Sequence, residues 1–291
     1  MQRALVVGPG SMVGSRLSEH LRARGWQVIG AGRSGDCEVP LELGCDSLCT
    51  EFPAVEADVL FHCAAAFGDD SPQGAWLNDR VNVLGAHQVV ALARAAGCRQ
   101  VVYAGSVSSA RREGAAFASS YGASKARAEG VLAWALAQSG QTFVSLRFAQ
   151  LYDERGDCIR HQRWFGRIVS YARSGRVLRL PPGDAPRNFV HVCDAVTAMT
   201  LASEAGAEGV LHVCHPHSES YLSLARHAYE VFGQGGEVQI AQEKTAFWPA
   251  YFPPASPELA TLGLTFTPLL DGLRAIRDGG YAARFEVFDV T

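Results

Sequence analysis

A tyrosine and a lysine four residues apart, in the segment YGASK (121–125), have the types and spacing that proton transfer requires. Tyr121 and Lys125 fall one turn apart on one face of a predicted helix. A free tyrosine has a pKa near 10 and is a poor acid–base catalyst at neutral pH, whereas a nearby cation stabilises the phenolate. Lowering the pKa of Tyr121 to about 7 corresponds to about 4 kcal/mol. The pair therefore predicts an acid–base centre.

A serine at the end of a predicted strand is the expected third member of this centre. The segment VVYAGSVSS (101–109) places Ser106 at the end of a buried strand, with Ser108 as a second candidate. Ligands of open α/β sheets bind outside the carboxyl ends of the strands, where such a serine lies. The Y-x-x-x-K spacing alone is weak evidence, because any helix surface can carry it. The pair follows both a glycine loop and a strand that ends in serine, and this order favours a catalytic role over a chance match.

The glycine loop follows the first predicted strand, in the segment ALVVGPGSMVGSRL (4–17), with glycines at 8, 10 and 14. Its spacing departs from G-x-G-x-x-G, because Val13 stands at the third glycine position. It also departs from G-x-x-G-x-x-G, because Ser11 stands at the middle position. A strand, glycines and a helix in direct succession are nevertheless the context in which such a loop binds a dinucleotide.

Each small residue of the loop has an expected role. Gly8 permits the tight turn after the strand, Gly10 lets backbone N–H groups approach a pyrophosphate, and Gly14 lets the helix pack closely on the sheet. The helix N-terminus supplies a positive dipole and unpaired N–H groups. Ser11 is small enough for the bend, and its hydroxyl can donate to a phosphate oxygen.

The end of the second predicted strand indicates which dinucleotide is bound. An NAD site has an acidic residue about 20 residues after the glycines, which bonds the ribose 2′-hydroxyl. Here the strand ends GAGRSGD, so Arg33 and Ser34 stand where the acid would be, with Asp36 nearby. An arginine and a serine can instead bind a 2′-phosphate. The sequence therefore favours NADP(H) over NAD(H), which stays the alternative.

The composition indicates a soluble globular protein. The chain has 291 residues, of which 48% are hydrophobic and 19% charged, and the formal net charge is −3. This charge gives no electrostatic case for a nucleic acid or an anionic membrane as partner. No apolar run approaches the ~18 residues of a membrane span, and a first strand near Arg3 leaves no room for a signal peptide. We expect a cytoplasmic protein whose eight cysteines, without any C-x-x-C, are reduced thiols.

Short β runs alternate with helical patterns in the first half of the chain, which predicts a doubly wound parallel sheet of the Rossmann type. A change of rhythm after Gln150 predicts a smaller C-terminal substrate-binding lobe. We expect a nucleotide-binding lobe over 1–150, with 187–205 returning to it, and a substrate lobe over 151–291. Strands are predicted at 3–8, 26–32, 39–43, 57–66, 100–106 and 142–148, and helices at 12–24, 76–96 and 119–139.

Together these features resemble the extended short-chain dehydrogenase/reductase family, which comprises NAD(P)-dependent sugar-nucleotide epimerases, dehydratases and reductases. The resemblance covers nearly the whole chain. Its further motifs are H-x-A-A in FHCAA (61–65), N-x-x-G in RVNVLGAHQVVALARAAG (80–97) with Asn82 as the structural asparagine, L-R-x-x-N-x-Y-G in LRFAQLYD (146–153), R-D-F-V-H-V-x-D in RNFVHVCDAV (187–196), and L-G-x-x-P in PELATLGLTFTPLLDGL (257–273).

The resemblance implies roles for these residues. Tyr121 would exchange a proton with the substrate oxygen, Ser106 would hold that oxygen, and Lys125 would bind the nicotinamide ribose and lower the pKa of Tyr121. The helices at 80–97 and 119–139 match those that form homodimers in the family. Cofactor contacts are expected at Gly8, Gly10, Ser11, Met12, Val13, Gly14, Arg33, Ser34, Leu43, Cys63, Ala64, Ala65, Tyr121 and Lys125, and substrate contacts at Ser108, Gln150 and Arg187, the last near a nucleotide or phosphate.

Departures from the family pattern concern mainly the substrate. Gln150 stands where many sugar-nucleotide enzymes carry an asparagine that touches the diphosphate, and Asp153 replaces the glycine after Tyr152. A dehydratase would carry an Asp-Glu pair after the catalytic hydroxyl residue, whereas Ser106 is followed by Val107 and Ser108. A ketoreductase exchanges its cofactor at each turnover and commonly uses NADPH, so Arg33 favours a reductase that acts on a keto group of a nucleotide-linked sugar. The alternatives are an epimerase that retains NAD and a non-catalytic NADP sensor or scaffold, which would be expected to lose the tyrosine or lysine.

A cluster of histidines and a cysteine in HVCHPHSE (212–219) raises the question of a metal. Alternate residues of a strand point to opposite faces, so His212 and Cys214 face one way while His215 begins a loop that also carries His217. A polar lining of the substrate cleft is the better interpretation, and no metal is predicted. Arg147 is expected to be structural.

Overall fold

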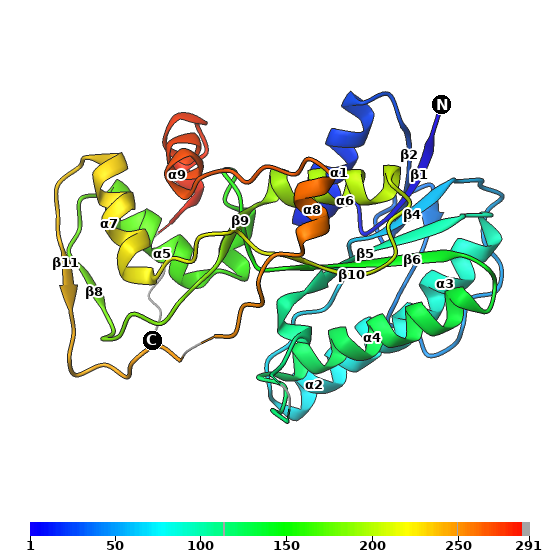
Figure 1. The fold of residues 1–291 in the computed structure, drawn as a ribbon, viewed down its shortest axis with the longest axis horizontal. Helices are drawn as coiled ribbons and strands as arrows, with labels where there is room; N and C mark the ends of the chain where they lie inside the picture. The colour runs from blue at the N-terminus through cyan, green and yellow to red at the C-terminus, as the bar shows by residue number, and fades with distance from the viewer. Residues whose placement is uncertain (113, 249, 287–291) are drawn as a thin grey trace. The chain divides into compact units, whose positions relative to one another are not determined.

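The computed structural model describes residues 1–112, 114–248 and 250–286, which form two compact units (Figure 1). The first unit comprises Met1–Phe148, Ala195–Val213 and Ala255–Leu264. The second comprises the remaining described residues, beginning at Ala149. The sequence placed the returning segment at 187–205, whereas the returning residues in the structure are Ala195–Val213 and Ala255–Leu264.

A seven-stranded sheet, parallel throughout, forms the centre of the first unit. Its strands lie in the order β3-β2-β1-β4-β5-β6-β10. Near-continuous apolar runs such as ALVV form these strands because both faces of a parallel sheet are buried. This order confirms the predicted doubly wound Rossmann-type sheet. The strands are β1 (Arg3–Val7), β2 (Gln27–Gly32), β3 (Val39–Pro40), β4 (Val59–His62), β5 (Gln100–Ser106), β6 (Thr142–Phe148) and β10 (Gly209–Val213).

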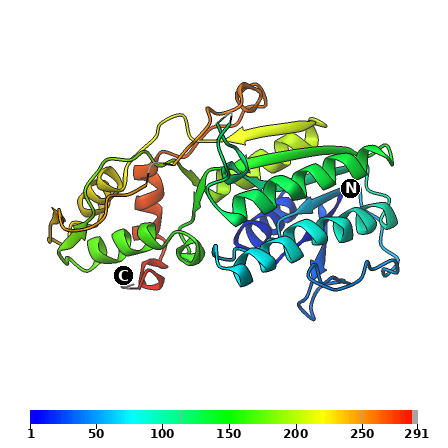
Figure 2. The same cartoon turned by 90° about the horizontal axis from the view of Figure 1, so that it is seen from below.

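Helices cover both faces of this sheet (Figures 1 and 2). One face carries α1 (Met12–Ala23) and α6 (Val192–Glu204), and the other carries α3 (Gly85–Ala95) and α4 (Ser120–Ala137). Side chains of β1, β4 and β5 pack with those of α3 and α4 into a continuous core that includes Leu5, Leu60, Val101, Leu92 and Leu132. This packing fixes where α4, which bears Tyr121 and Lys125, lies relative to the end of β5.

The segment 76–96 was predicted as one continuous α-helix, but a π-helical turn interrupts it. The structure has α2 (Pro72–Asn78), a π-helical segment over Asp79–Leu84 and then α3. Two asparagines four residues apart, Asn78 and Asn82, are buried here. Both bond the backbone of one loop, and the wider π-helical turn accompanies this inward placement.

Two predicted strands are longer than the strands observed. The run 39–43 pairs only at Val39 and Pro40, opposite Ala31 and Gly32. The run 57–66 ends as strand at His62, and the Cys63 N–H to Val7 carbonyl bond (2.9 Å) is the last it makes to β1. Beyond that point the chain turns away from the sheet to form part of the loop region described below.

The described residues of the second unit include two short parallel strand pairs and three helices of ten or more residues. Strand β7 (Gln150–Tyr152) pairs with β9 (Phe189–His191), and β8 (Leu178–Leu180) pairs with β11 (Val238–Ile240). The strand at 188–191 therefore does not join the main sheet. The helices are α5 (Arg163–Arg173), α7 (Tyr221–Phe232) and α9 (Leu269–Asp278), whereas the short α8 (Pro257–Thr261) belongs to the first unit.

The eight cysteines all lie in the described residues, and no disulfide joins any of them. Among the described helices, none combines the length and apolar character needed to cross a membrane.

Candidate active site

The glycine loop between β1 and α1 requires glycine at two of its positions. Gly8 has φ +79°, and a Cβ added there would lie 2.7 Å from the Ala64 Cβ. A Cβ on Gly14 would lie 2.1 Å from the Gly8 carbonyl oxygen, so α1 packs against the loop without room for a side chain. A Cβ on Gly10, in contrast, would meet no described atom within 4 Å. The open space lies over Gly10, where the sequence predicts a pyrophosphate.

Ser11 begins α1 as its N-cap. Its Oγ accepts a hydrogen bond from the Gly14 N–H (3.0 Å) and donates to the Gly8 carbonyl (2.9 Å), with the Cys63 carbonyl at 3.1 Å. The hydroxyl is thus occupied within the loop, which differs from the expected bond to a phosphate. The first-turn N–H groups at Met12 and Val13 have no intrahelical acceptor, and groups of this kind are the donors that a helix N-terminus offers an anion. The loop therefore fits a dinucleotide pyrophosphate.

The segment after β4 borders the same loop. Cys63 and Ala64 contact the loop through the Ser11 hydroxyl and Gly8, as described above, and Ala65 is exposed. Leu43 differs from these residues, because its side chain belongs to the hydrophobic core and packs against Gly85. Any contact of Leu43 with a cofactor would use its main chain.

Arg33 and Ser34 follow β2 on the surface of the first unit. The Arg33 side chain is 80% exposed, and its Nε lies 3.7 Å from a carboxylate oxygen of Glu42. The Ser34 hydroxyl bonds Asp36, and this bond lowers the pKa of the Asp36 carboxyl. Both residues that were expected to bind a 2′-phosphate are thus accompanied by an acid.

The end of β5 and the start of α4 approach each other through a glycine. A Cβ on Gly122 would lie 2.3 Å from the Ser108 carbonyl oxygen, so only glycine permits this approach. The Ser119 Oγ accepts a bond from the Gly122 N–H (3.1 Å) and caps the helix. The result brings the Tyr121 hydroxyl near the Ser106 side chain, which acts to lower the pKa of Tyr121. Ser106, the first choice from the sequence, thus meets Tyr121, whereas Ser108 is exposed and contributes its backbone.

Lys125 lies one turn further along α4 and is 2% exposed. Its Nζ donates to the Ala104 carbonyl (2.8 Å) and lies 4.0 Å from the centre of the Tyr103 ring. Burial lowers the pKa of Lys125 to about 7, against the opposing effects of Cys63 and Glu129.

The pKa of Tyr121 departs from the expectation. Burial raises it to about 12, although the hydrogen bond with Ser106 acts in the opposite direction. The ring also packs on Phe67, with centroids 4.5 Å apart, and this apolar neighbour adds to its removal from water. Desolvation disfavours the phenolate more than the serine stabilises it. At neutral pH Tyr121 is therefore protonated and can serve as a proton donor.

Two asparagines and two serines that the sequence pattern did not assign to catalysis hold the neighbouring loop. The Asn82 side chain pairs with both backbone groups of Ala66 (2.8 and 3.1 Å) and donates to the Ser124 Oγ (2.9 Å). Asn78 repeats the pattern with Gly68 (2.7 and 3.1 Å) and the Ser120 Oγ (3.0 Å). In the sequence, these paired bonds could have been predicted from the i, i+4 spacing of the two asparagines and of the two serines.

A buried ion pair lies behind Lys125 on the same face of α4. Glu129 is 7% exposed and accepts bonds from the Ser145 Oγ (2.6 Å) and the Arg147 Nε (3.0 Å) of β6. Arg147 is therefore a partner of α4, in line with the structural role expected for it. Tyr121, Lys125 and Glu129 are spaced at i, i+4 and i+8, so one helical stripe carries all three.

The two remaining predicted substrate residues lie in the second unit. The Gln150 Nε2 donates to Gln162 Oε1 (3.0 Å) and lies 3.4 Å from the Tyr221 hydroxyl. Arg187 is 7% exposed, and its guanidinium donates to the carbonyls of Pro186 (2.8 Å) and Trp248 (3.0 Å). The guanidinium also stacks on aromatic rings, 4.8 Å from the Tyr221 centroid and 5.7 Å from that of Phe247. An aromatic enclosure thus surrounds the arginine that was expected near a phosphate.

The described residues contain one group of three potential metal ligands, Glu154, His191 and Cys193. The Nδ1 of His191 accepts from the Cys193 N–H (3.3 Å), and Nε2 lies 3.3 Å from a carboxylate oxygen of Glu154. Burial opposes the charged ring, but the Cys193 side chain and the Glu154 carboxylate raise the pKa of His191 to about 9. Protein groups thus engage both ring nitrogens, as expected of a histidine that caps α6. The segment 212–217 forms no such group among the described residues.

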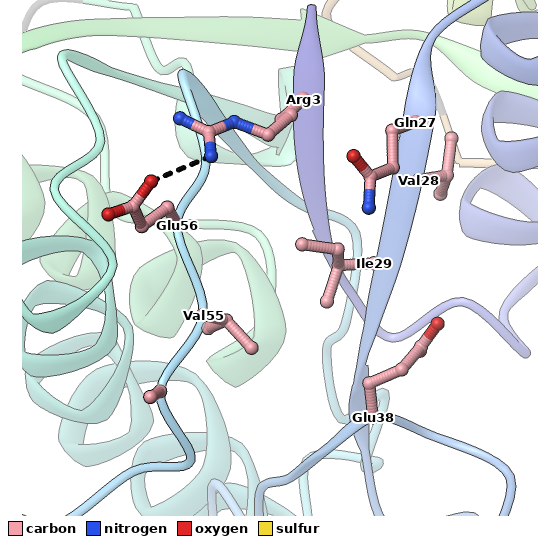
Figure 3. Close-up of a pocket in the computed structure, with 8 residues that line it drawn as sticks. Arg3, Gln27, Val28, Ile29, Glu38, Val55 and Glu56 are labelled. Carbon is pink, nitrogen blue, oxygen red and sulfur yellow. Dashed lines mark hydrogen bonds and ion pairs between the residues drawn. The ribbon is translucent and has the colours of Figure 1, made fainter.

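A pocket of about 370 Å³ lies away from these groups (Figure 3). It is lined by the first residues of β1 and β2, including Arg3 and Gln27, and by Val55, Glu56 and Glu38. The amino ends of parallel strands lie at the edge opposite the glycine loop. The pocket therefore does not belong to the candidate site.

Comparisons with known proteins agree with this architecture. Residues 4–214 match the family described as NAD dependent epimerase/dehydratase family. A protein of a Streptomyces species, described as "3-diazoavenalumate denitrifying reductase", is 30% identical over 241 residues, which are 72% of this chain and 75% of that protein.

Solved structures of 4-epimerases have the same fold. UDP-N-acetylglucosamine 4-epimerase from Bacillus cereus superposes with a TM-score of 0.78 at 19% identity, covering 100% of this chain and 99% of that one. UDP-glucose 4-epimerase from Thermus thermophilus, in complex with NAD, gives a TM-score of 0.76 at 22% identity, covering 98% and 99%. With the family match over most of the chain, these findings show that this protein is an enzyme of the NAD-dependent epimerase/dehydratase family, in the extended short-chain dehydrogenase/reductase group.

Proposed function

We propose that this enzyme is a reductase that transfers hydride to a carbonyl carbon, with Ser106, Tyr121 and Lys125 as its catalytic residues. The observation that carries the proposal is the meeting of Ser106 and Tyr121 at the carboxyl end of β5, where Ser106 acts to lower the pKa of Tyr121, with the buried Lys125 one turn away. This end of the sheet is where ligands bind in open α/β folds. The glycine loop that fits a pyrophosphate lies at the same end of β1, which β4 separates from β5 in the sheet.

The protonation state of Tyr121 favours reduction over epimerisation. A reductase begins with proton donation to the carbonyl oxygen, and a tyrosine with a pKa of about 12 holds that proton at neutral pH. An epimerase begins with oxidation and needs a base first. A bound nicotinamide dinucleotide would supply the hydride. Ser106 would hold the carbonyl oxygen, Tyr121 would give it a proton, and Lys125 would hold the nicotinamide ribose.

The first substrate candidate is a keto group on a nucleotide-linked sugar. The enzymes of the similar solved structures are named for UDP-sugars. The experiment is incubation of the protein with NADPH deuterated at C4 and a UDP-4-keto-sugar, followed by mass spectrometry. One deuterium in the sugar product supports the proposal. The absence of transfer to any carbonyl compound of a broad panel would contradict it.

A second substrate candidate, one with a planar apolar group, is favoured by the surroundings of Arg187. The guanidinium groups that bind a diphosphate have N–H donors directed at the ligand. Here two such donors bond Pro186 and Trp248, and the faces of the guanidinium lie on Tyr221 and Phe247. The Streptomyces relative is named as a reductase of a diazo compound rather than of a sugar nucleotide. The deuterium panel therefore includes aromatic carbonyl compounds as its second arm.

We also propose that Arg33 and Ser34 make the enzyme prefer NADP(H). The exposed guanidinium can turn from Glu42 to a 2′-phosphate, since an ion pair at 3.7 Å on the surface is weak. Exchange of NADPH at each turnover also suits a reductase.

Arg33→Ala is expected to weaken NADPH binding about tenfold, while NADH affinity changes less than about twofold. Fluorescence titration of the two dinucleotides measures both values. The matched variant Glu42→Gln removes the competing acid and is expected to strengthen NADPH binding. Equal losses for NADPH and NADH in Arg33→Ala would remove the 2′-phosphate assignment.

A homodimer is proposed through the helices of the first unit. Four large apolar side chains of α2, the π-helical segment and α4 are exposed by 46–64%: Trp76, Leu77, Leu84 and Trp134. Apolar side chains gathered on neighbouring helices are typical of an interface. Trp134→Glu is expected to convert a dimer to a monomer in sedimentation velocity. A wild-type protein that sediments as a monomer at micromolar concentration would contradict this arrangement.

A further inference from the structure

The ammonium of Lys125 lies on the face of a tyrosine. Its Nζ is 4.0 Å from the centre of the Tyr103 ring, and it donates a hydrogen bond to the Ala104 carbonyl (2.8 Å). Both groups come from β5, one and two residues before Gly105 and close to Ser106. Tyr103 and Lys125 are 1% and 2% exposed, so water does not solvate this cation. A desolvated cation over an aromatic face is stabilised by the negative charge of that face.

We propose that Tyr103 is a positioning residue, whose ring face holds the Lys125 ammonium where it serves Tyr121 and the dinucleotide. This inference rests on the proposed role of Lys125. It assigns to Tyr103 an electrostatic task beyond filling the core, because a leucine of similar burial would leave the ammonium with the carbonyl alone.

Several titratable groups around Lys125 carry no charge at neutral pH. From β4, His62 stacks on Tyr103 with centroids 5.2 Å apart, and burial lowers its pKa to about 3, so it is neutral. The adjacent Cys63 thiol is also neutral, because burial raises its pKa to about 12. On α4 itself, Tyr121 is protonated at neutral pH.

One negative group, Glu129, acts on Lys125 from the next turn of α4. Its charge is shared with Arg147 and Ser145 of β6, to which it is directly bonded. A paired carboxylate stabilises a second cation less than an unpaired one does. The Tyr103 ring therefore acts on Lys125 together with the Ala104 carbonyl and this paired carboxylate.

The sign of the expected pH effect follows from this arrangement. With a pKa of about 7, Lys125 is near half-protonated at neutral pH, and the ring favours the charged form. Weakening the ring quadrupole lowers this pKa further. As the pH rises, Lys125 then loses its proton earlier, and the NADPH binding that needs the ammonium falls at a lower pH than in the wild type.

The test replaces Tyr103 by rings of equal shape and different charge distribution. Tyr103→Phe keeps the negative face, whereas pentafluorophenylalanine at the same position removes it with little change in volume. The probe is NADPH, titrated by fluorescence against the whole protein between about pH 5 and about pH 9. We expect the Tyr103→Phe variant to lose NADPH affinity over the same alkaline pH range as the wild type. For the pentafluoro variant this range is expected to move down by about one pH unit, a tenfold change in proton affinity.

Two controls make the outcomes separable. Pentafluorophenylalanine at Phe61, a fully buried ring of β4 that packs on Trp26, alters an aromatic side chain elsewhere and is expected to leave the profile unchanged. Lys125→Met is expected to abolish the alkaline loss altogether. If the loss persists in Lys125→Met, it belongs to another group and the proposed role of Lys125 fails. If it vanishes there but stays fixed in the pentafluoro Tyr103 variant, the inference about Tyr103 alone is overturned.

Discussion

Tyr121→Phe is expected to lower kcat/KM by about 10³-fold. The phenol is the group that donates a proton to the substrate oxygen, and phenylalanine keeps the ring, its packing on Phe67 and the helix N-terminus. Only the O–H and its bond with Ser106 are lost. Affinity for NADPH is therefore expected to change no more than a few-fold. Steady-state kinetics with the substrate from the deuterium panel, together with fluorescence titration, separates the two quantities.

A second tyrosine serves as control for this variant. Tyr229→Phe on α7 removes a hydroxyl that bonds the Arg176 carbonyl in the second unit and is not one of the proposed catalytic groups. It is expected to retain wild-type turnover. Turnover in Tyr121→Phe within tenfold of wild type would remove Tyr121 as the proton donor.

Gly14→Ala is expected to have the largest effect on cofactor binding without touching the catalytic residues. Its Cβ would lie 2.1 Å from the Gly8 carbonyl oxygen, so α1 must move away from the loop. Overpacking of this kind costs about 1–3 kcal/mol of folding stability. The shift also displaces the N-terminus of α1, and we expect NADPH affinity to fall by at least about tenfold. Urea denaturation and fluorescence titration measure the two effects.

Substitutions at two other glycines distinguish an effect on packing from an effect on cofactor binding. Gly10→Ala places its Cβ in open space, so the free energy of unfolding is expected to be unchanged while NADPH affinity falls. Gly130→Ala on α4 also meets no described atom within 4 Å and is expected to stabilise the protein by up to about 1 kcal/mol. If Gly10→Ala binds NADPH as tightly as wild type, the pyrophosphate does not lie over Gly10.

The sequence predicted the main sheet well because its strands carry a strong local pattern. Segments such as ALVV and QVVYAGS are apolar on both faces, and turns or helices follow each of them. Gly8 follows the first of these segments and Ser106 ends the second, while Tyr121 lies on the helix predicted after it. The candidate residues could therefore be proposed together with the sheet. The Ser106–Tyr121 contact needed one further fact, the close approach of Gly122 to Ser108, which no periodicity reveals.

Features that depend on tertiary contacts were not predictable from local pattern. The π-helical segment over Asp79–Leu84 accompanies the bonds of Asn78 and Asn82 to a distant loop. Ser11 was expected to bond a phosphate, but its hydroxyl is used as a helix cap. The pKa of Tyr121 was expected to fall beside a lysine. Burial raises it instead, while the Lys125 ammonium points to the Ala104 carbonyl and the Tyr103 ring.

Whether this enzyme is a reductase that exchanges NADPH at each turnover can be tested most directly without any substrate. Purified protein is denatured and any released dinucleotide is identified, after which the emptied protein is titrated with NADPH and NADH. We expect little bound dinucleotide and a preference for NADPH of at least about tenfold, or about 1.4 kcal/mol. Stoichiometric NAD⁺ carried through purification would instead indicate an epimerase and contradict both the reductase proposal and the assignment of Arg33.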